Sequence, residues 1–187
     1  MFKVIEPQEY CYYRGRVDLF VELLKQRQDV PLSSEEQELS TFIVGQGEEG
    51  HIYGGAILQQ RHVSELPAHI ESVISTVIPN RKHVWAATFS LCAEPAIEDP
   101  SLFYADLLKR FIDFGKEKSS SFLCLSLTPA EYMRTEGWPY VLEVSPDETS
   151  DGLFHGILSL SGDAHALRAS GRTSLIPSSP SKRQLAA

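Results

Sequence analysis

Histidine, serine and cysteine are among the side chains of this sequence that could ligate a metal ion or act as nucleophiles. The six histidines include no pair at the H-x-x-x-H spacing that places two imidazoles on one helix face for zinc. The sequence also contains no G-x-S-x-G, P-loop or G-x-G-x-x-G motif. We therefore expect no metal site, and no local motif predicts a serine hydrolase or a nucleotide-binding protein.

Three cysteines, Cys11, Cys92 and Cys124, are an odd number and form no C-x-x-C pair. This usage predicts reduced thiols in a cytoplasmic protein. Cys92 and Cys124 lie in apolar, strand-like runs with no histidine close in sequence. Because burial raises the pKa of a thiol, we expect both to be small core residues and not catalytic nucleophiles.

The overall composition is that of a soluble globular protein, with 187 residues, 42% hydrophobic and 22% charged. A net charge of −8 argues against binding to nucleic acid or to an anionic membrane, which needs basic surface. No apolar run is long enough for a membrane span, and the N-terminal "MFKVIEPQEY" lacks the apolar segment of a signal peptide.

Hydrophobic periodicity predicts strands interleaved with helices, which is typical of an α/β sheet with helices on its faces. Apolar residues at helical spacing predict helices over residues 12–27, 65–78, 101–118 and 129–137. The helix over 101–118 is expected to stop at Gly115. Residues 29–40 are expected to form a loop or a short capped turn. Strands are predicted over residues 2–7, 40–46, 51–60, 83–92, 120–128, 138–144 and 152–162, the last of which closes the sheet.

The sequence changes character at about residue 163. "GDAHALRASGRTSLIPSSPSKRQLAA" is rich in Ser, Ala and Pro and has no periodic apolar face. We therefore expect one folded domain over residues 1–162 and a mobile, basic tail over residues 163–187.

Several stretches resemble the acyl-homoserine-lactone synthases, a branch of the GNAT acyltransferase fold. "VWAATFSLC", and later "AEYMRTEGWPYVLE", resemble the second half of that family. "RVDLFVELL" places Arg16 and Phe20 like its R-x-x-x-F-V-E helix, and "STFIVGQGEEGHIYGGAILQQ" resembles its hairpin. The resemblance covers roughly residues 5–160. It implies a GNAT-like mixed, mostly antiparallel central sheet flanked by helices on both faces.

The chain departs from this family at its charged positions. The carboxylate of the synthase motif V-W-E-L-S-R-F corresponds to Ala86, and its arginine corresponds to Phe89. The hairpin arginine corresponds to Ile57, and the tryptophan that follows the helix phenylalanine corresponds to Gln26. The loss of one catalytic group costs orders of magnitude in rate, so ordinary synthase chemistry is not expected.

The segment after the strand over 83–92 also departs from the coenzyme A signature of GNAT enzymes, R/Q-x-x-G-x-G/A. "CAEPAIEDPSLFYADLL" has no Gly or Arg, and its four acidic residues would repel a pyrophosphate. Pro95 and Pro100 remove two amide donors. This composition argues against coenzyme A, although the resemblance includes synthases that lack the motif and still bind acyl carriers.

Two functions from different classes remain open. In the first, the protein is a catalytically degenerate GNAT-fold adaptor or regulatory module without a cofactor. Its cleft between the central strands would be lined or filled by Ile57, Trp85 and Phe89, and a protein partner would bind an exposed patch. The candidate residues of that patch are Tyr12, Tyr13, Phe103 and Arg110.

In the second, the protein is an N-acyltransferase with a relocated active site. Its donor would be acyl-CoA or an acyl carrier protein, with S-adenosylmethionine as a further candidate ligand. Glu94, Tyr104 and Tyr132 would be its most plausible acid or base groups. The backbone of Cys92, Ala93 and Glu94 would contact the thioester carbonyl.

Overall fold

The computed structural model describes residues 2–27, 32–47, 52–77, 80–92, 100–144, 149 and 152–160. Within these ranges the strands are β1 (Phe2–Ile5), β2 (Thr41–Gln46), β3 (Ile52–His62), β4 (His83–Cys92), β5 (Phe122–Leu127), β6 (Tyr140–Val144) and β7 (Phe154–Ser159). The α-helices are α1 (Tyr10–Arg27), α2 (Ser34–Leu39), α3 (Ala68–Val77), α4 (Pro100–Glu117) and α5 (Pro129–Arg134). Two 3₁₀ turns, η1 (Pro7–Glu9) and η2 (Val63–Glu65), complete these elements.

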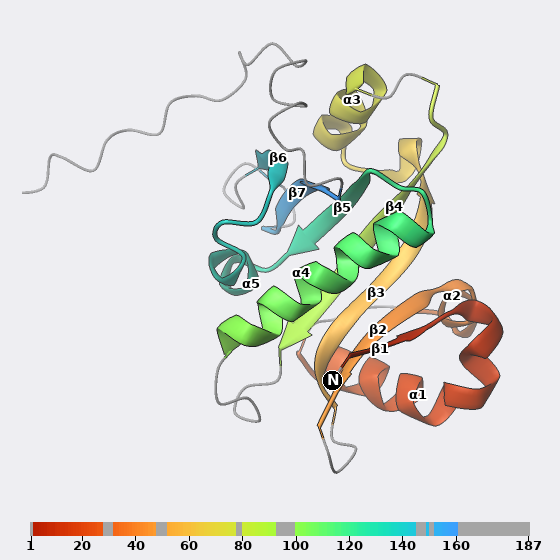
Figure 1. The fold of residues 1–187 in the computed structure, drawn as a ribbon. Coiled ribbons are helices and arrows are strands. Elements are labelled where there is room, and N and C mark those ends of the chain that lie inside the picture. Colours follow the sequence, from red (N-terminus) through yellow and green to blue (C-terminus); the bar gives the residue numbers. More distant parts are fainter. Residues whose placement is uncertain are drawn as a thin grey trace, which may run out of the picture.

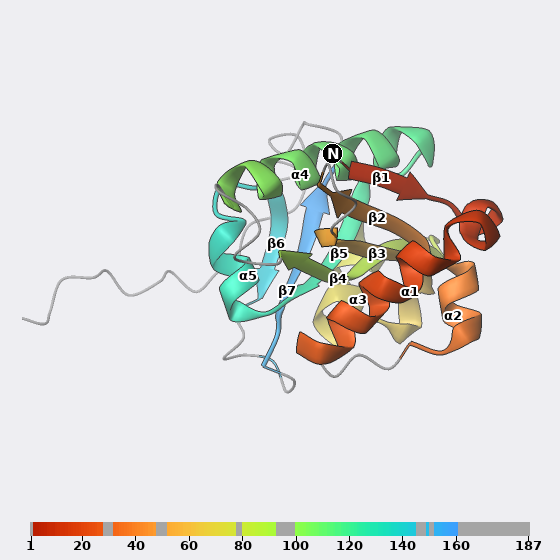
Figure 2. The ribbon, with the colours of Figure 1, turned by 90° about the horizontal axis from the view of Figure 1, so that it is seen from below.

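All seven strands form one sheet in the order β1-β2-β3-β4-β5-β7-β6 (Figure 1). Strands β4 and β5 pair in parallel, and every other neighbouring pair is antiparallel. Helix α4 covers one face of the sheet, and α1, α2 and α3 lie on the opposite face (Figure 2). This arrangement confirms the predicted mixed, mostly antiparallel sheet with helices on both faces.

The short helices begin at residues that cap them locally. The Ser33 side chain accepts a hydrogen bond from the Glu36 backbone N–H, and the Glu36 carboxylate accepts one in return from the Ser33 N–H. Thr128 and Glu131 form the same reciprocal capping box at the start of α5, where Pro129 follows the cap. The predicted short capped turn within 29–40 is therefore a capped helix.

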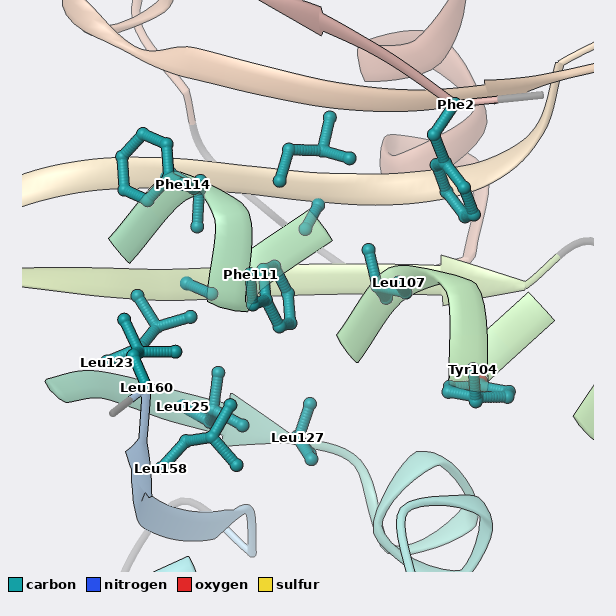
Figure 3. Close-up of a cluster of buried hydrophobic side chains, with 14 of the residues drawn as sticks. Phe2, Tyr104, Leu107, Phe111, Phe114, Leu123, Leu125, Leu127, Leu158 and Leu160 are labelled. Atoms are coloured by element: carbon teal, nitrogen blue, oxygen red, sulfur yellow. The ribbon is translucent and has the colours of Figure 1, made fainter. Parts of the chain in front are cut away.

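The apolar core on the α4 face is continuous across the sheet (Figure 3). Helix α4 contributes Leu107, Phe111 and Phe114, which are at most 1% exposed. The facing side of β5 contributes only leucines, Leu123, Leu125 and Leu127. Because successive side chains of a strand point to opposite faces, the side chains that alternate with these leucines lie on the face that α3 covers.

Two smaller apolar clusters lie on the opposite face. One joins α1 to β2 and β3 through Val17, Phe20 and Leu24. The other joins α3 to the centre of the sheet through Ile70, Ile74, Val84, Ala86, Phe122, Cys124 and Ile157. Among the described side chains, the apolar residues on the side of the sheet opposite α4 thus form two separate clusters.

Two details of the fold differ from the expectation. Helix α4 continues past Gly115 to Glu117, and the chain turns at Ser119, whose φ is 51°. A Cβ at Gly115 would lie 2.6 Å from Leu160 Cδ1 and 2.9 Å from the Ser120 carbonyl oxygen, so this glycine permits close packing and does not end the helix. The last strand, β7, also lies between β5 and β6, which leaves β6 at the edge of the sheet.

The predicted tail over residues 163–187 lies outside the described residues. None of the helices in the described ranges combines the length and apolar character needed to cross a membrane.

Candidate functional site

Strands β4 and β5 separate after a very short parallel contact. Their only paired residues are Ala86 with Cys124 and Ala87 with Leu125. Beyond this point β4 stays paired with β3 as far as Cys92, and β5 stays paired with β7 as far as Leu127. The two inner strand edges are thus not hydrogen-bonded to each other within the described residues, and a divergence of strands opens at the centre of the sheet.

Ser126 is the first β5 residue after the last parallel pair, and its side chain bonds a histidine. Its Oγ lies 2.9 Å from Nδ1 of His155, the residue directly opposite it on β7. Both side chains lie on the face that α3 covers, because they alternate with the leucines of the α4 face. Ser126 is half-buried and His155 is 5% exposed. The hydroxyl and the imidazole therefore meet within hydrogen-bond distance, mostly shielded from water.

Helix α3 places a second imidazole next to this pair. The rings of His69 and His155 lie 5.6 Å apart between centroids, with 55° between their planes. His69 stands near the start of α3, one residue before the buried Ile70. The α3 packing thus brings residues from three separate segments of the chain to one point.

Ala86 lies on the same face as Ser126. It is 6% exposed and belongs to the apolar cluster under α3. Its β5 partner, Cys124, is two residues before Ser126, which corresponds to about 7 Å along the strand. The resemblance expects a carboxylate at Ala86. The structure shows a small apolar side chain there and a Ser–His pair close by.

The β3 partner of Ala86 is also polar. Gln59 is 7% exposed, and its Nε2 donates to Ser40 Oγ at 3.1 Å. Arg61 donates to the side-chain amide oxygen Oε1 of Gln59, and its guanidinium also lies 3.8 Å from the Glu36 carboxylate. This face of the central strands therefore carries polar groups on both sides of Ala86.

The residues expected to fill one cleft lie on different faces. Ile57 is fully buried in the α1 cluster. Trp85 is half-buried on the α4 face, where its ring meets Phe114 edge-on at 4.8 Å. The side chain of Phe89 lies outside the described ones. Ile57 and Trp85 therefore do not fill a common space.

The two candidate tyrosines belong to the α4 side. Tyr104 is 3% exposed and packs edge-on against Phe103. Tyr132 stacks on Phe154 at 3.9 Å, and its hydroxyl donates to Glu143 Oε1 at 3.3 Å. Partial burial, followed by the nearby Glu143 carboxylate, raises the pKa of Tyr132. A phenol of this kind keeps its proton at neutral pH, but it packs against the core opposite the Ser126 side.

The remaining site predictions concern the segment after β4. Ala93 and Glu94 lie outside the described residues, and only the backbone of Cys92 is described, at the end of β4. Cys124 is buried as predicted, and burial raises the pKa of its thiol to about 12. Its thiolate is therefore not available at neutral pH.

The predicted protein-binding residues do not form one surface. Tyr12 is 83% exposed on α1, and the ring of its neighbour Tyr13 lies under the Lys3 ammonium at 4.4 Å. Phe103, in contrast, is 4% exposed and packs in the α4 core with Phe2 and Tyr53. Arg110 is half-buried on α4. Phe103 is thus unavailable to a partner.

Sequence reasoning missed Ser126 and His155 as a pair. The two residues are 29 positions apart, and no local motif joins them. Their common face does follow from the period-two alternation within each strand. The missing information was which strands are neighbours, because β7 pairs with β5 and not only with the preceding β6.

No protein-family model matches this chain, and no curated protein matches it. Solved structures do share its fold. MesI, a CoA-dependent acyl-homoserine lactone synthase, superposes with a TM-score of 0.56 at 12% identity over 90% of this chain and 93% of its own. FeeM, an N-acyl amino acid synthase from uncultured soil microbes, gives 0.56 at 12% identity over 89% and 93%. BjaI, a CoA-dependent acyl-homoserine lactone synthase, gives 0.51 at 12% identity over 90% and 88%.

These likenesses show that the chain has an acyl-homoserine-lactone-synthase-like GNAT fold, as the sequence resemblance predicted. They also correct one expectation. A chain of this fold was expected to act without a cofactor, but MesI and BjaI are both described as CoA-dependent, and BjaI was solved with SAM and isopentyl-CoA. The prediction of no cofactor was therefore wrong. It relied on the composition of the segment after β4 and on the substituted charged positions, and these do not decide whether the fold binds a thioester.

Proposed function

We propose that this protein binds an acyl thioester between β4 and β5 and transfers the acyl group to an amine. The observation that carries the proposal is the divergence of these strands after the pairs Ala86–Cys124 and Ala87–Leu125. Backbone N–H and C=O groups that are not paired across the gap are hydrogen-bonding sites for an extended chain. The pantetheine arm of an acyl thioester is an extended chain with two amide groups, so it suits this position.

The fold supports the same proposal. The neighbours with a TM-score above 0.5 include synthases of acyl-homoserine lactones and of N-acyl amino acids, which share the transfer of an acyl group to nitrogen. Within the described residues, Ala86 and Ile57 stand where the resemblance expects charged side chains. The acceptor is therefore not expected to be held as in those synthases, and an amino acid or another small amine is the class to test.

The proposal is tested by titrating the full chain with decanoyl-CoA, with CoA and with decanoic acid in a calorimeter. We expect decanoyl-CoA to bind, CoA to bind more weakly and decanoic acid not to bind, because the pantetheine amides provide the contacts. A ligand at about 100 times its Kd adds about 2.7 kcal/mol to the free energy of unfolding. Melting should rise by roughly 5–10 °C for a chain of this size. No heat and no shift with any of the three would contradict the proposal.

Turnover is measured next, by incubating the protein and decanoyl-CoA with amino acids, polyamines and S-adenosylmethionine and detecting the N-decanoyl products by mass spectrometry. One class of amine should give a product that the protein-free control lacks. The absence of every product despite donor binding would support the second candidate function below.

That second candidate is a regulatory or adaptor module that keeps the fold without synthase catalysis. It is favoured by one observation, the complete burial of Ile57 and near-complete burial of Ala86 in apolar clusters. In this case donor binding would change the affinity for a protein partner. The discriminating result is donor binding without any acyl product.

A further inference from the structure

We propose that Ser126 and His155 form a nucleophile–base pair that accepts the acyl group as a covalent serine ester. This inference rests on the proposed donor site, because it needs a thioester between β4 and β5. Ser126 is the first residue of β5 beyond the parallel contact, so it lies where β4 and β5 begin to diverge. A thioester held against the β4 edge would pass this residue.

The geometry of the pair is that of an activated nucleophile. The Ser126 Oγ to His155 Nδ1 distance of 2.9 Å lies within the range of a nucleophile bonded to its base. His155 is 5% exposed, whereas Ser126 is half-buried and keeps access to a bound molecule. The burial of His155 thus holds the base in place, and the partial exposure of Ser126 leaves its hydroxyl accessible to a bound molecule.

A second Ser–His contact in the chain joins residues that are neighbours in the sequence, and it serves as a comparison for the Ser126–His155 pair. His62 Nδ1 lies 2.7 Å from Ser64 Oγ, but the two residues are two positions apart, their contact is exposed, and His62 is the N-cap of the turn η2. Helix capping accounts for that contact. Ser126 and His155 cap no helix, come from different strands, and lie beside the divergence of the central strands. The two pairs therefore provide a matched comparison.

The proposed step balances as follows. With the His155 proton on Nε2, Nδ1 accepts the Ser126 hydroxyl proton while Oγ attacks the thioester carbonyl. The Oγ–C bond forms, the C–S bond breaks, and the Nδ1 proton passes to the departing thiolate, which leaves as a free thiol. The acceptor amine then attacks the ester carbonyl and gives a proton to Nδ1. The C–Oγ bond breaks, and the proton returns to Ser126.

The first test uses the full chain and a chemical probe, so the natural acyl donor need not be known. A fluorophosphonate probe reacts with serine hydroxyls that a base activates, and peptide mapping locates the label. We expect labelling at Ser126 that is lost in Ser126→Ala and falls about a hundredfold or more in His155→Asn. Ser64→Ala should be labelled at the same rate as the unchanged protein. Labelling at the unchanged rate in Ser126→Ala, or no label at Ser126 in the unchanged protein, would overturn the inference.

Because His155 is buried, its replacement could unfold the chain. Ser126→Cys keeps a nucleophile at the same place with little change in volume. Incubated with decanoyl-CoA and no amine, the unchanged protein should gain one decanoyl group at Ser126, and Ser126→Cys should gain it at residue 126. Calorimetry on the same samples separates the two proposals. Decanoyl-CoA that binds without acylating Ser126 overturns this inference alone, whereas decanoyl-CoA that does not bind overturns the proposed function.

Discussion

On its α4 side strand β5 presents Leu123, Leu125 and Leu127, whereas on its α3 side the same strand presents Phe122, Cys124 and Ser126. The neighbouring strand β7 repeats this contrast, with Phe154 and Leu158 toward α4 and His155 toward α3. One face of the central sheet is therefore continuous apolar core, and the other ends in a polar pair where β4 and β5 separate. The polar pair on the α3 face is the place where we propose that chemistry occurs, and the α4 face is packed core.

The strongest test of this contrast removes a core ring from α4. Phe114 is 1% exposed and meets Trp85 edge-on. Phe114→Ala should lower the free energy of unfolding by about 3–5 kcal/mol, because it removes buried area and leaves a cavity. Chemical denaturation measures this loss. Leu102→Ala on the same helix is the control, because Leu102 is 65% exposed and its replacement should change stability by less than about 0.5 kcal/mol. Equal effects of the two changes would contradict the assignment of the core.

A second test concerns the face that α1 covers. A Cβ at Gly55 would lie 2.0 Å from the Ile43 carbonyl oxygen and 3.2 Å from the Phe20 ring. Gly55→Ala should therefore cost about 2–3 kcal/mol, because β2 and β3 must move apart. Gly15→Ala is the matched control, since nothing lies within 4 Å of its added Cβ inside α1. There the higher helix propensity of alanine should stabilise the protein by about 0.5–1 kcal/mol. Thermal melts that show the same sign for both variants would refute the close approach at Gly55.

A smaller effect is expected where the end of α4 meets the start of the chain. Lys118 Nζ lies 2.9 Å from Glu6 Oε2, and the side chains are 30% and 16% exposed. Lys118→Ala should cost about 1 kcal/mol, and less at about 1 M salt, which screens the pair. Lys116→Ala provides the control, because its contact with Asp113 is long, at 3.8 Å, and exposed. A loss for Lys116→Ala as large as for Lys118→Ala would show that partial burial of the pair adds nothing.

The smallest expected effect is on reactivity and not on stability. Burial raises the pKa of the Cys124 thiol to about 12, so this group stays protonated at about pH 8. Cys11 is exposed. Brief treatment with iodoacetamide should alkylate Cys11 and leave Cys124 unmodified until the chain is denatured, as peptide mapping would show. Because the pKa lies above the usual value, alkylation of Cys124 should rise only as pH approaches 12. Equal modification of both cysteines at about pH 8 would contradict the burial of Cys124.

The sequence was sufficient to predict most elements because each depends on local information. The apolar run over residues 120–128 and the helical spacing of apolar residues over 101–118 are examples. The extent of α4 was predicted less well, because Gly115 was taken as a stop signal when its role is to admit Leu160. That role depends on a partner 45 positions away, and no local pattern reveals it.

The candidate site was less predictable than the fold. Tyr104 and Tyr132 were predicted as acid or base groups of a relocated active site, and the structure places both on the apolar α4 side. Ser126 and His155 follow only from the pairing of β5 with β7, which is a property of the sheet order. Sequence periodicity gives the face of each side chain, but it does not give the neighbour across the strand.

The central claim is that an acyl thioester binds where β4 and β5 separate, and hydrogen–deuterium exchange with and without decanoyl-CoA tests it most directly. Bound donor should slow exchange at the amides of residues 88–92 of β4 and residues 126–127 of β5, by about tenfold or more at saturation. Residues 2–5 of β1 and 41–46 of β2 should exchange at unchanged rates. Protection confined to β1 and β2, or equal rates everywhere in the presence of saturating donor, would contradict the account.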